Sequence, residues 1–235
     1  MKDKKTGEKF PPRSPAWNLW QALVLMLLVN LLEFPLGWLE TPKDLDILPG
    51  RMHFVLVGFG EGVLYLVSVG ILLWRVKRTF RELGFVRARW RYIFLGIITG
   101  ILLFVGIGLL GNLLTQLVGV PAPQSFTEAV KGSKYTWEFW LLLFLAGVVA
   151  PIKEEAIFRG LLYPPLRQAY GRGKGILITG VFFAILHLDF IRFLPLFLGG
   201  IILTWLYERS SSIWPSIIAH GIWNILMAVA VWIQR

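Results

Sequence analysis

Residues 92–118 read YIFLGIITGILLFVGIGLLGNLLTQLV and contain no charged side chain. A transmembrane helix needs about 20 predominantly apolar residues, so this stretch is long enough to cross a bilayer. The whole chain of 235 residues has the same character, with 56% hydrophobic residues, 16% charged residues and a mean hydropathy of +0.65. Soluble domains carry roughly a quarter charged residues. Lipid must therefore cover much of this protein, and the sequence predicts an integral membrane protein.

Six more apolar stretches accompany this one. They are residues 17–38, 54–74, 137–163, 175–188, 193–207 and 213–233. The expected fold class is all-α, a polytopic helical bundle of about seven transmembrane helices. Six to eight are compatible with the sequence, because the fifth and sixth helices are shorter than a full crossing. Gly96 and Gly100, four residues apart, indicate close packing against another helix, and Gly106, Gly108 and Gly111 would extend that surface.

Basic residues mark one side of the membrane. The loop 75–91 holds seven Lys or Arg and one acidic residue, for a net charge of +6. The tail 1–16 holds five Lys or Arg against two acidic residues, and Arg167, Arg172 and Lys174 precede the fifth helix. Because short cytoplasmic loops are enriched in Lys and Arg, these segments are expected in the cytoplasm and the C-terminus outside. The expected location is the plasma membrane of a prokaryote.

Three parts follow along the chain: the basic tail 1–16, the first three helices in residues 17–136, and a core in residues 137–235. The net charge of +10 is concentrated at the helix ends. A lipid bilayer explains this better than a nucleic-acid groove, so no nucleic-acid partner is expected. The chain has no cysteine, which excludes disulfides, thiolate metal sites and a cysteine nucleophile.

The core carries charged groups where an apolar helix should have none. Residues 151–160 read PIKEEAIFRG, and an ionisable group in a span costs roughly 2.5 to 3.5 kcal/mol, so each needs a reason. Glu155 and Arg159 lie four residues apart, acid first, which favours an ion pair on one helix face. Glu154 is rotated from them by about 100°. It is therefore the carboxylate that is free for chemistry, unless both acids simply pair with basic neighbours at the membrane interface.

Two histidines lie in other helices of the core. His187 follows Phe183 by four residues, and His220 precedes Asn224 by four, so that each pair projects from one helix face. At about 1.5 Å per residue from the cytoplasmic helix ends, Glu154, both histidines and Asn224 fall roughly 10 to 20 Å into the membrane. We therefore expect them to form one site.

Such a site supports hydrolysis of an amide. A carboxylate in a poorly hydrated pocket can act as general base on water, and a histidine can position that water or carry its proton. A second histidine with an asparagine amide can donate hydrogen bonds to an oxyanion. Alternatively, Glu154, His187 and His220 could hold a divalent metal such as zinc, with one position open to water. These residues do not choose between the two mechanisms, and no organic cofactor is expected.

In order and spacing, the motifs Glu-Glu-x-x-x-Arg, Phe-x-x-x-His and His-x-x-x-Asn resemble those of the CAAX-protease and bacteriocin-processing (Abi) family. The resemblance covers about residues 137–233. It implies an intramembrane endopeptidase that cleaves near the C-terminus of a membrane-associated, in some members prenylated, protein or peptide. It further implies catalytic roles for Glu154, His187, His220 and Asn224, with Glu155, Arg159 and Phe183 in support. Family members have been described as both glutamate and metallo peptidases, so the cofactor stays open.

Two other functions remain. A non-catalytic scaffold or bacteriocin-immunity protein could use the same fold, although all the polar motif residues are retained. A proton-coupled transporter could use intramembrane Glu and His, with Glu33 and Glu61 as further candidates.

Overall fold

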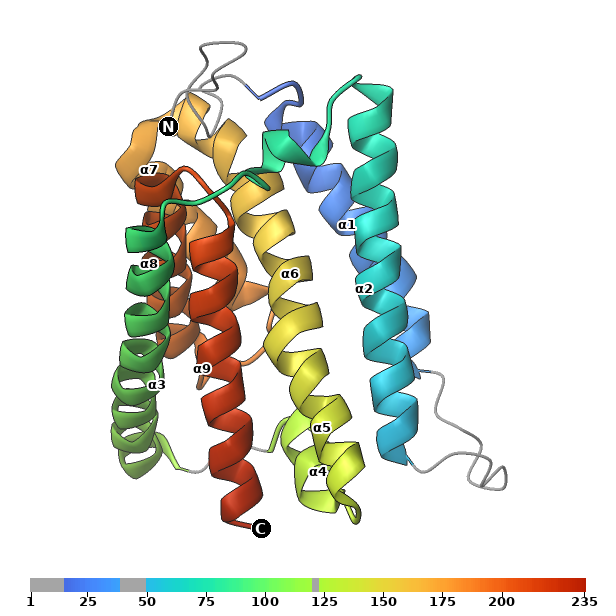
Figure 1. The fold of residues 1–235 in the computed structure, drawn as a ribbon, viewed down its shortest axis with the longest axis vertical. Coiled ribbons are helices and arrows are strands. Elements are labelled where there is room, and N and C mark those ends of the chain that lie inside the picture. Colours follow the sequence, from blue (N-terminus) through green and yellow to red (C-terminus); the bar gives the residue numbers. More distant parts are fainter. Residues whose placement is uncertain (1–14, 39–49, 120–122) are drawn as a thin grey trace.

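The computed structural model describes residues 15–38, 50–119 and 123–235. Nearly all of the predicted tail 1–16, and the side chain of Glu33, lie outside the described part. Figure 1 shows a bundle of helices in which α6 lies centrally between α9 and α2. The helical elements are α1 (Leu19–Trp38), α2 (Gly50–Arg75), η1 (Phe80–Leu83), α3 (Trp90–Val118), α4 (Ser125–Gly132), α5 (Thr136–Phe144), η2 (Leu145–Val149), α6 (Ala150–Glu155), η3 (Ala156–Leu162), α7 (Tyr163–Ile185), α8 (Phe193–Ser210) and α9 (Trp214–Ile233).

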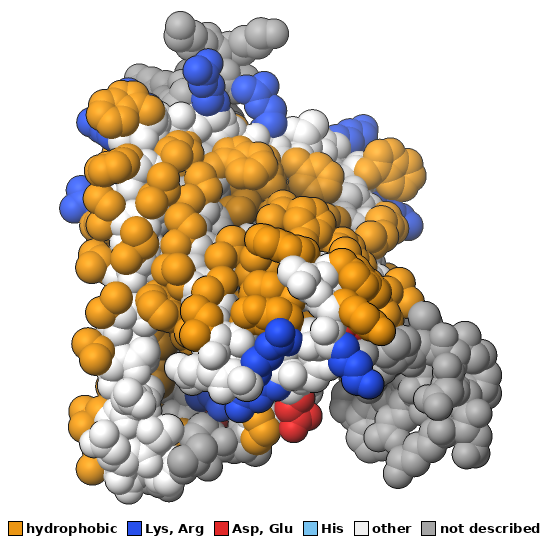
Figure 2. Space-filling view, turned by 60° about the horizontal axis from the view of Figure 1, so that its bottom comes forward, with side chains coloured by type: hydrophobic (Ala, Val, Ile, Leu, Met, Phe, Trp, Pro, Cys, Tyr) orange, Lys and Arg blue, Asp and Glu red, His pale blue; other side chains and the backbone are white. Residues whose placement is uncertain are grey.

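The all-α membrane bundle predicted from the sequence is confirmed. Among the described residues, three helical stretches are long and apolar enough to cross a bilayer: Val55–Arg75, Trp90–Leu117 and Trp214–Ile233. Figure 2 shows hydrophobic side chains forming a broad band on the surface, with lysines and arginines at its upper and lower margins. α1, α8 and the continuous run from α5 to η3 match the other predicted helices, apart from small shifts at their ends.

The helix that carries the two glutamates has two wide, π-type turns, η2 and η3, which the sequence pattern did not predict. Each ends just before proline. The N–H of Ala150 donates to the carbonyl of Leu145, five residues back, and Pro151 has no N–H to continue the pattern. The N–H of Tyr163 likewise donates five residues back, and two prolines follow it. The prolines therefore leave carbonyl groups in these turns without a helical donor.

One of these carbonyl groups ties the first helix to the core. Leu161 lies four residues before Pro165, which has no N–H to offer. Its carbonyl accepts a hydrogen bond of 2.8 Å from the indole Nε1 of Trp17, which is 2% exposed. A buried indole N–H normally has a partner, and here the wide turn supplies it.

The glycine-rich segment of residues 171–174, between the predicted fourth and fifth helices, lies within α7 at a kink where two helical stretches meet. α7 runs through it with a single non-helical residue, Gly171, at φ 79° and ψ 172°. Glycine adopts positive φ without steric cost, so one residue redirects the chain and no loop is needed. The short α4, in the predicted outer loop, was also missed, because eight residues give too little apolar periodicity.

Glycine allows α9 to lie directly against its neighbours. A Cβ on Gly96 or Gly100 would come within 2.6 Å of a backbone carbonyl oxygen of α9, which confirms the close packing predicted for this pair. A Cβ on Gly221 would collide with the carbonyl oxygen of Gly147 in η2. The predicted extension of the surface is wrong, because a Cβ at Gly106, Gly108 or Gly111 would meet nothing within 4 Å.

We predict that Gly221→Ala lowers the thermal stability of the detergent-solubilised protein. The added methyl group pushes α9 away from η2, and overpacking of this kind costs about 1–3 kcal/mol. Gly106→Ala is the matched control, because it adds the same methyl group to open space in a helix. Melting temperatures measured in one detergent give the comparison. An equal effect of the two substitutions would contradict the close contact.

Candidate active site

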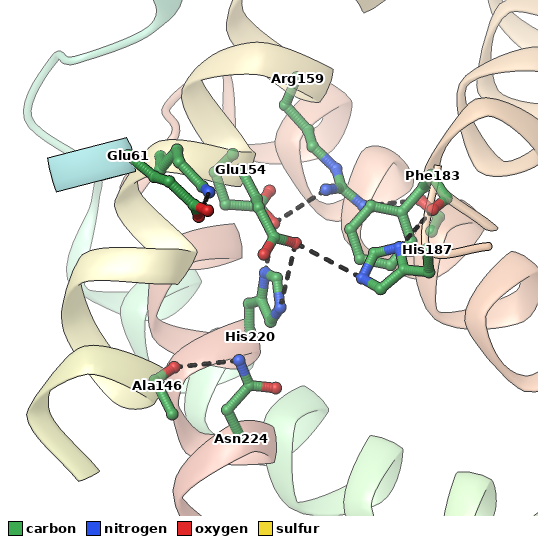
Figure 3. Close-up of polar contacts among 11 residues, drawn as sticks. Glu61, Ala146, Glu154, Arg159, Phe183, His187, His220 and Asn224 are labelled. Atoms are coloured by element: carbon green, nitrogen blue, oxygen red, sulfur yellow. Dashed lines mark hydrogen bonds and ion pairs between the residues drawn. The ribbon is translucent and has the colours of Figure 1, made fainter. Parts of the chain in front are cut away.

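Glu154 lies at the centre of the predicted site, on α6. Its Oε2 atom is 3.9 Å from Nε2 of His187 and 3.9 Å from Nε2 of His220. Figure 3 shows the carboxylate between the two imidazole rings, which come from the end of α7 and from α9. This Oε2 is buried and has no hydrogen-bond partner among the described protein groups, although the side chain as a whole is 21% exposed. The structure therefore brings together Glu154, His187 and His220, three of the four residues that the sequence places at one depth.

The second carboxylate, that of Glu155, contacts Arg159 and His220 directly. Oε1 of Glu155 accepts a hydrogen bond of 2.9 Å from Nη1 of Arg159, the predicted pair, and both side chains are fully buried. The same Oε1 lies 2.9 Å from Nδ1 of His220. Because a carboxylate only accepts, Nδ1 of His220 carries a proton and its Nε2 points toward Glu154. Glu155 thus fixes the orientation of the ring that faces the first carboxylate.

A different acceptor orients His187. Its Nδ1 lies 2.6 Å from the carbonyl oxygen of Phe183, one turn earlier on α7. A carbonyl can only accept, so Nδ1 is the protonated nitrogen and Nε2 faces Glu154. Both histidines therefore present the same ring atom to the carboxylate, one supported by a neutral group and the other by a carboxylate.

Phe183 fills the space behind these side chains. It is fully buried, and its ring centroid lies 4.8 Å from that of His187 and 5.8 Å from that of His220. The guanidinium carbon of Arg159 lies 4.7 Å from the Phe183 ring centroid on the other side. Arg159 also donates to the carbonyl of Gly200 in α8, at 3.2 Å. The aromatic ring thus packs against both histidine rings and against the buried guanidinium.

Asn224 lies one turn beyond His220 on α9. Its amide nitrogen donates a hydrogen bond of 3.0 Å to the carbonyl of Ala146 in η2. The residue five positions after Ala146 is Pro151, so the wide turn provides no N–H for that carbonyl and the amide takes it. Figure 3 places this contact on the far side of His220 from Glu154. One amide hydrogen of Asn224 is therefore committed to the backbone, and the other remains for a ligand.

A cavity of about 560 Å³ adjoins the site. Glu154, His187, His220 and Asn224 all line it, together with apolar side chains that include Leu145, Leu196 and Trp223. Such a volume is typical of sites that take small ligands or short peptide segments.

The cavity wall also contains charged residues that the motifs did not identify. Nζ of Lys153 lies 3.3 Å from Oε2 of Glu61, which joins α6 to α2. Arg192, at the start of α8, pairs with Asp189. The signal for Glu61 was its charge within an apolar helix, but no sequence spacing connects α2 to the motifs.

Zinc would require closer ligands than these residues provide. Two imidazole nitrogens and a carboxylate oxygen are donors that zinc accepts, and tetrahedral ligands about 2.1 Å from the metal lie roughly 3.4 Å apart. The separations here are 3.9 Å. No group of three His, Asp or Glu in the described part of the chain has metal-binding geometry. As they stand, Glu154, His187 and His220 do not fit the metal.

Residues 136–226 match the family model described as Type II CAAX prenyl endopeptidase Rce1-like. The protein named "Putative membrane peptidase YdiL" of Bacillus subtilis (strain 168) is 32% identical over 89 residues, which are 38% of this chain and 36% of that protein. UPF0177 protein YxdF of Lactococcus lactis subsp. lactis (strain IL1403) is 27% identical over 89 residues, 37% of this chain and 49% of that protein. No solved structure matches the chain.

The similarity thus spans about a third to a half of the curated relatives' length. The match to the family model begins at α5 and ends in α9, and it includes every motif residue from Glu154 to Asn224. Residues 136–226 of this membrane protein therefore match the Rce1-like CAAX prenyl endopeptidase family, in agreement with the resemblance that the three motifs carry.

Proposed function

We propose that the chain is an intramembrane endopeptidase that hydrolyses a peptide bond near the C-terminus of a membrane-associated protein or peptide. One observation carries the proposal: the unpartnered Oε2 of Glu154 faces two imidazole nitrogens at 3.9 Å in the wall of a cavity. We place the chain in a prokaryotic plasma membrane, and the basic loops support a cytoplasmic N-terminus.

The distances around Glu154 suit a water molecule. A separation of 3.9 Å is too long for a direct hydrogen bond. A water between Oε2 and either Nε2 can lie about 2.8 Å from both atoms, which is an ordinary hydrogen-bond length, and we place one water against all three. The carboxylate is thus positioned to remove a proton from that water.

Counting protons assigns different roles to the two histidines. Nε2 of each ring accepts while the ring is neutral, and so does Oε2 of Glu154, but one water has only two hydrogens for three acceptors. A proton on His220 resolves this, because Glu155 lies 2.9 Å from its Nδ1, whereas His187 faces a neutral carbonyl. With that proton, the positive charges of His220 and Arg159 balance the negative charges of Glu154 and Glu155. Such balance matters because unpaired buried charge is costly.

Hydrolysis then proceeds without a covalent intermediate. Glu154 takes a proton from the water, and the water oxygen attacks the carbonyl carbon of the peptide bond. The negative oxygen that forms accepts hydrogen bonds from Nε2 of His220 and from the second amide hydrogen of Asn224. The C–N bond breaks as the proton held by Glu154 passes through neutral His187 to the leaving nitrogen. Glu154 ends as it began, and the products are a carboxylic acid and an amine, which become a carboxylate and an ammonium group when the acid proton passes to the amine.

We predict that Glu154→Gln abolishes turnover without unfolding the protein. The amide keeps the size of the side chain but cannot accept the proton, so kcat falls by at least about 10². His187→Ala and His220→Ala should also lose cleavage, whereas His53→Ala, outside all three motifs, should not. Single-turnover cleavage of a reporter peptide in proteoliposomes measures all four variants. Near-normal cleavage by Glu154→Gln would refute the assignment of the base.

We predict that Glu155→Gln lowers stability instead. It leaves the fully buried Arg159 without its counter-charge, and breaking a buried ion pair costs about 3–5 kcal/mol. Partial activity should remain in the molecules that stay folded. Thermal unfolding of both glutamine variants in one detergent makes the comparison. A folded but inert Glu155→Gln beside an active Glu154→Gln reverses the two roles.

We predict that cleavage persists in the presence of 1,10-phenanthroline, because Glu154 and the two histidines stand too far apart to hold zinc. The measurement is the initial rate before and after chelation. Loss of activity that added zinc restores would show that substrate draws these residues together around a metal.

A further inference from the structure

The cavity extends from the catalytic residues in one direction along the bundle. On α9, counted from Trp214, the lining residues His220, Asn224 and Met227 lie about 9, 15 and 20 Å along the helix. On α3, counted from Trp90 at the same end of the bundle, the lining residue Asn112 lies about 33 Å along. The catalytic side chains therefore line the end of the cavity nearer Trp214. Met227 and Asn112 line the part that is farther along the bundle.

The far end of this cavity continues into a second hollow of about 290 Å³. The two share Gly111, Arg192 and Pro195, and the second adds Leu114 and Thr115 near the end of α3 and Pro123 just before α4. Arg192 lies 18 residues before Ser210, which corresponds to about 27 Å along α8. Since Ser210 lies near the start of α9, Arg192 lies at the far end of the bundle. Asn112 of the first cavity and Gln124 beside α4 are exposed. The hollow thus opens beside α4, at the end of the bundle where the C-terminus lies (Figure 1).

The opposite end is closed by packed side chains and backbone. Leu83 of η1 is fully buried, and a Cβ on Gly160 would come within 2.8 Å of it. The hydroxyl of Tyr207, also fully buried, donates to the carbonyl of Leu83 at 3.2 Å. The N–H of Ile213 donates to the carbonyl of Gly84 at 2.8 Å. The segment between α2 and α3 is therefore held across this end of the bundle, and Figure 1 shows it crossing at the end opposite the C-terminus.

The positions of the basic residues indicate which side of the membrane the closed end faces. The same segment lies within the basic loop 75–91, and Arg167, Arg172 and Arg209 lie at this end on α7 and α8. Basic residues flanking short loops mark the cytoplasmic side. The open end is then extracytoplasmic.

We infer that substrate peptides reach Glu154 from the extracytoplasmic half of the membrane, through the space beside α3, α4 and the start of α8. This rests on the proposed peptidase function. The substrate is an apolar peptide segment, because Ile107, Phe126, Leu196, Trp223 and Met227 line the route, and its polar end lies near Arg192 and Asn112 at the mouth. A peptide anchored in the cytoplasmic leaflet would meet the closed end.

Single cysteines test the route directly, because the natural chain has none. Met227→Cys and Asn112→Cys place a thiol in the cavity, and Arg87→Cys reports on the basic loop. Leu102→Cys is the control for lipid exposure, since this side chain is 64% exposed and lies outside the cavity. A charged, membrane-impermeant methanethiosulfonate reagent is added to intact cells or to inside-out vesicles. Reaction is scored by mass, which needs no peptidase activity.

We expect Met227→Cys and Asn112→Cys to react only in intact cells, Arg87→Cys only in inside-out vesicles, and Leu102→Cys in neither. Modification of Met227→Cys should also abolish cleavage in proteoliposomes, while modification of Arg87→Cys leaves it intact. Reaction of both cavity thiols from the side that labels Arg87→Cys, or from neither side, overturns the inference. So does labelling of Arg87→Cys from outside the cell. The expected labelling in a chain that cleaves nothing refutes the peptidase and not the access route.

Discussion

The carboxylate of Glu155 is buried at 0% exposure, and an anion in such a position must be paired from several directions. Arg159 supplies one partner from its own helix and His220 supplies another from α9, both at 2.9 Å from the same oxygen. Arg159 in turn binds the carbonyl of Gly200, which brings in α8. The ion pair of Glu155 and Arg159 thus connects three helices, and the cost of leaving either charge unpaired holds them in register. Glu154 can remain without a direct partner because its neighbour satisfies this requirement.

The backbone contributes as much as the side chains to this arrangement. Prolines after η2 and η3 deprive two carbonyls of helical donors, and these carbonyls accept from Asn224 and from Trp17. Within a membrane a backbone group without a partner is costly, so each contact is enforced. The same region of η2 meets α9 at Gly147 and Gly221, where two helices touch without side chains between them. Proline and glycine together therefore set the distance between the carboxylates and the histidine helix.

Much of the site could be predicted from the sequence because its members obey local geometry. The spacing of Glu155 and Arg159 fixed their pairing, and equal depth brought Glu154 near both histidines. The wide turns escaped prediction because proline signals a disturbed helix without saying whether it kinks, ends or widens. The pair of Lys153 and Glu61 escaped because it depends on how α2 packs. At Gly171, between the predicted fourth and fifth helices, one residue at positive φ makes the change of direction.

The wide turn at η2 contains one residue more than an ordinary helical turn would need. Deleting a single residue there would restore ordinary α-helical turns with little change in the length of the span, and Pro151 would still leave the carbonyl four residues before it without a donor. Yet each residue of an α-helix turns the chain by about 100°, so the part that carries Glu154 would rotate by that angle relative to α5. The carboxylates would then point away from α9. The shortened chain would keep its hydrophobic pattern, but its two carboxylates would no longer face the histidine helix.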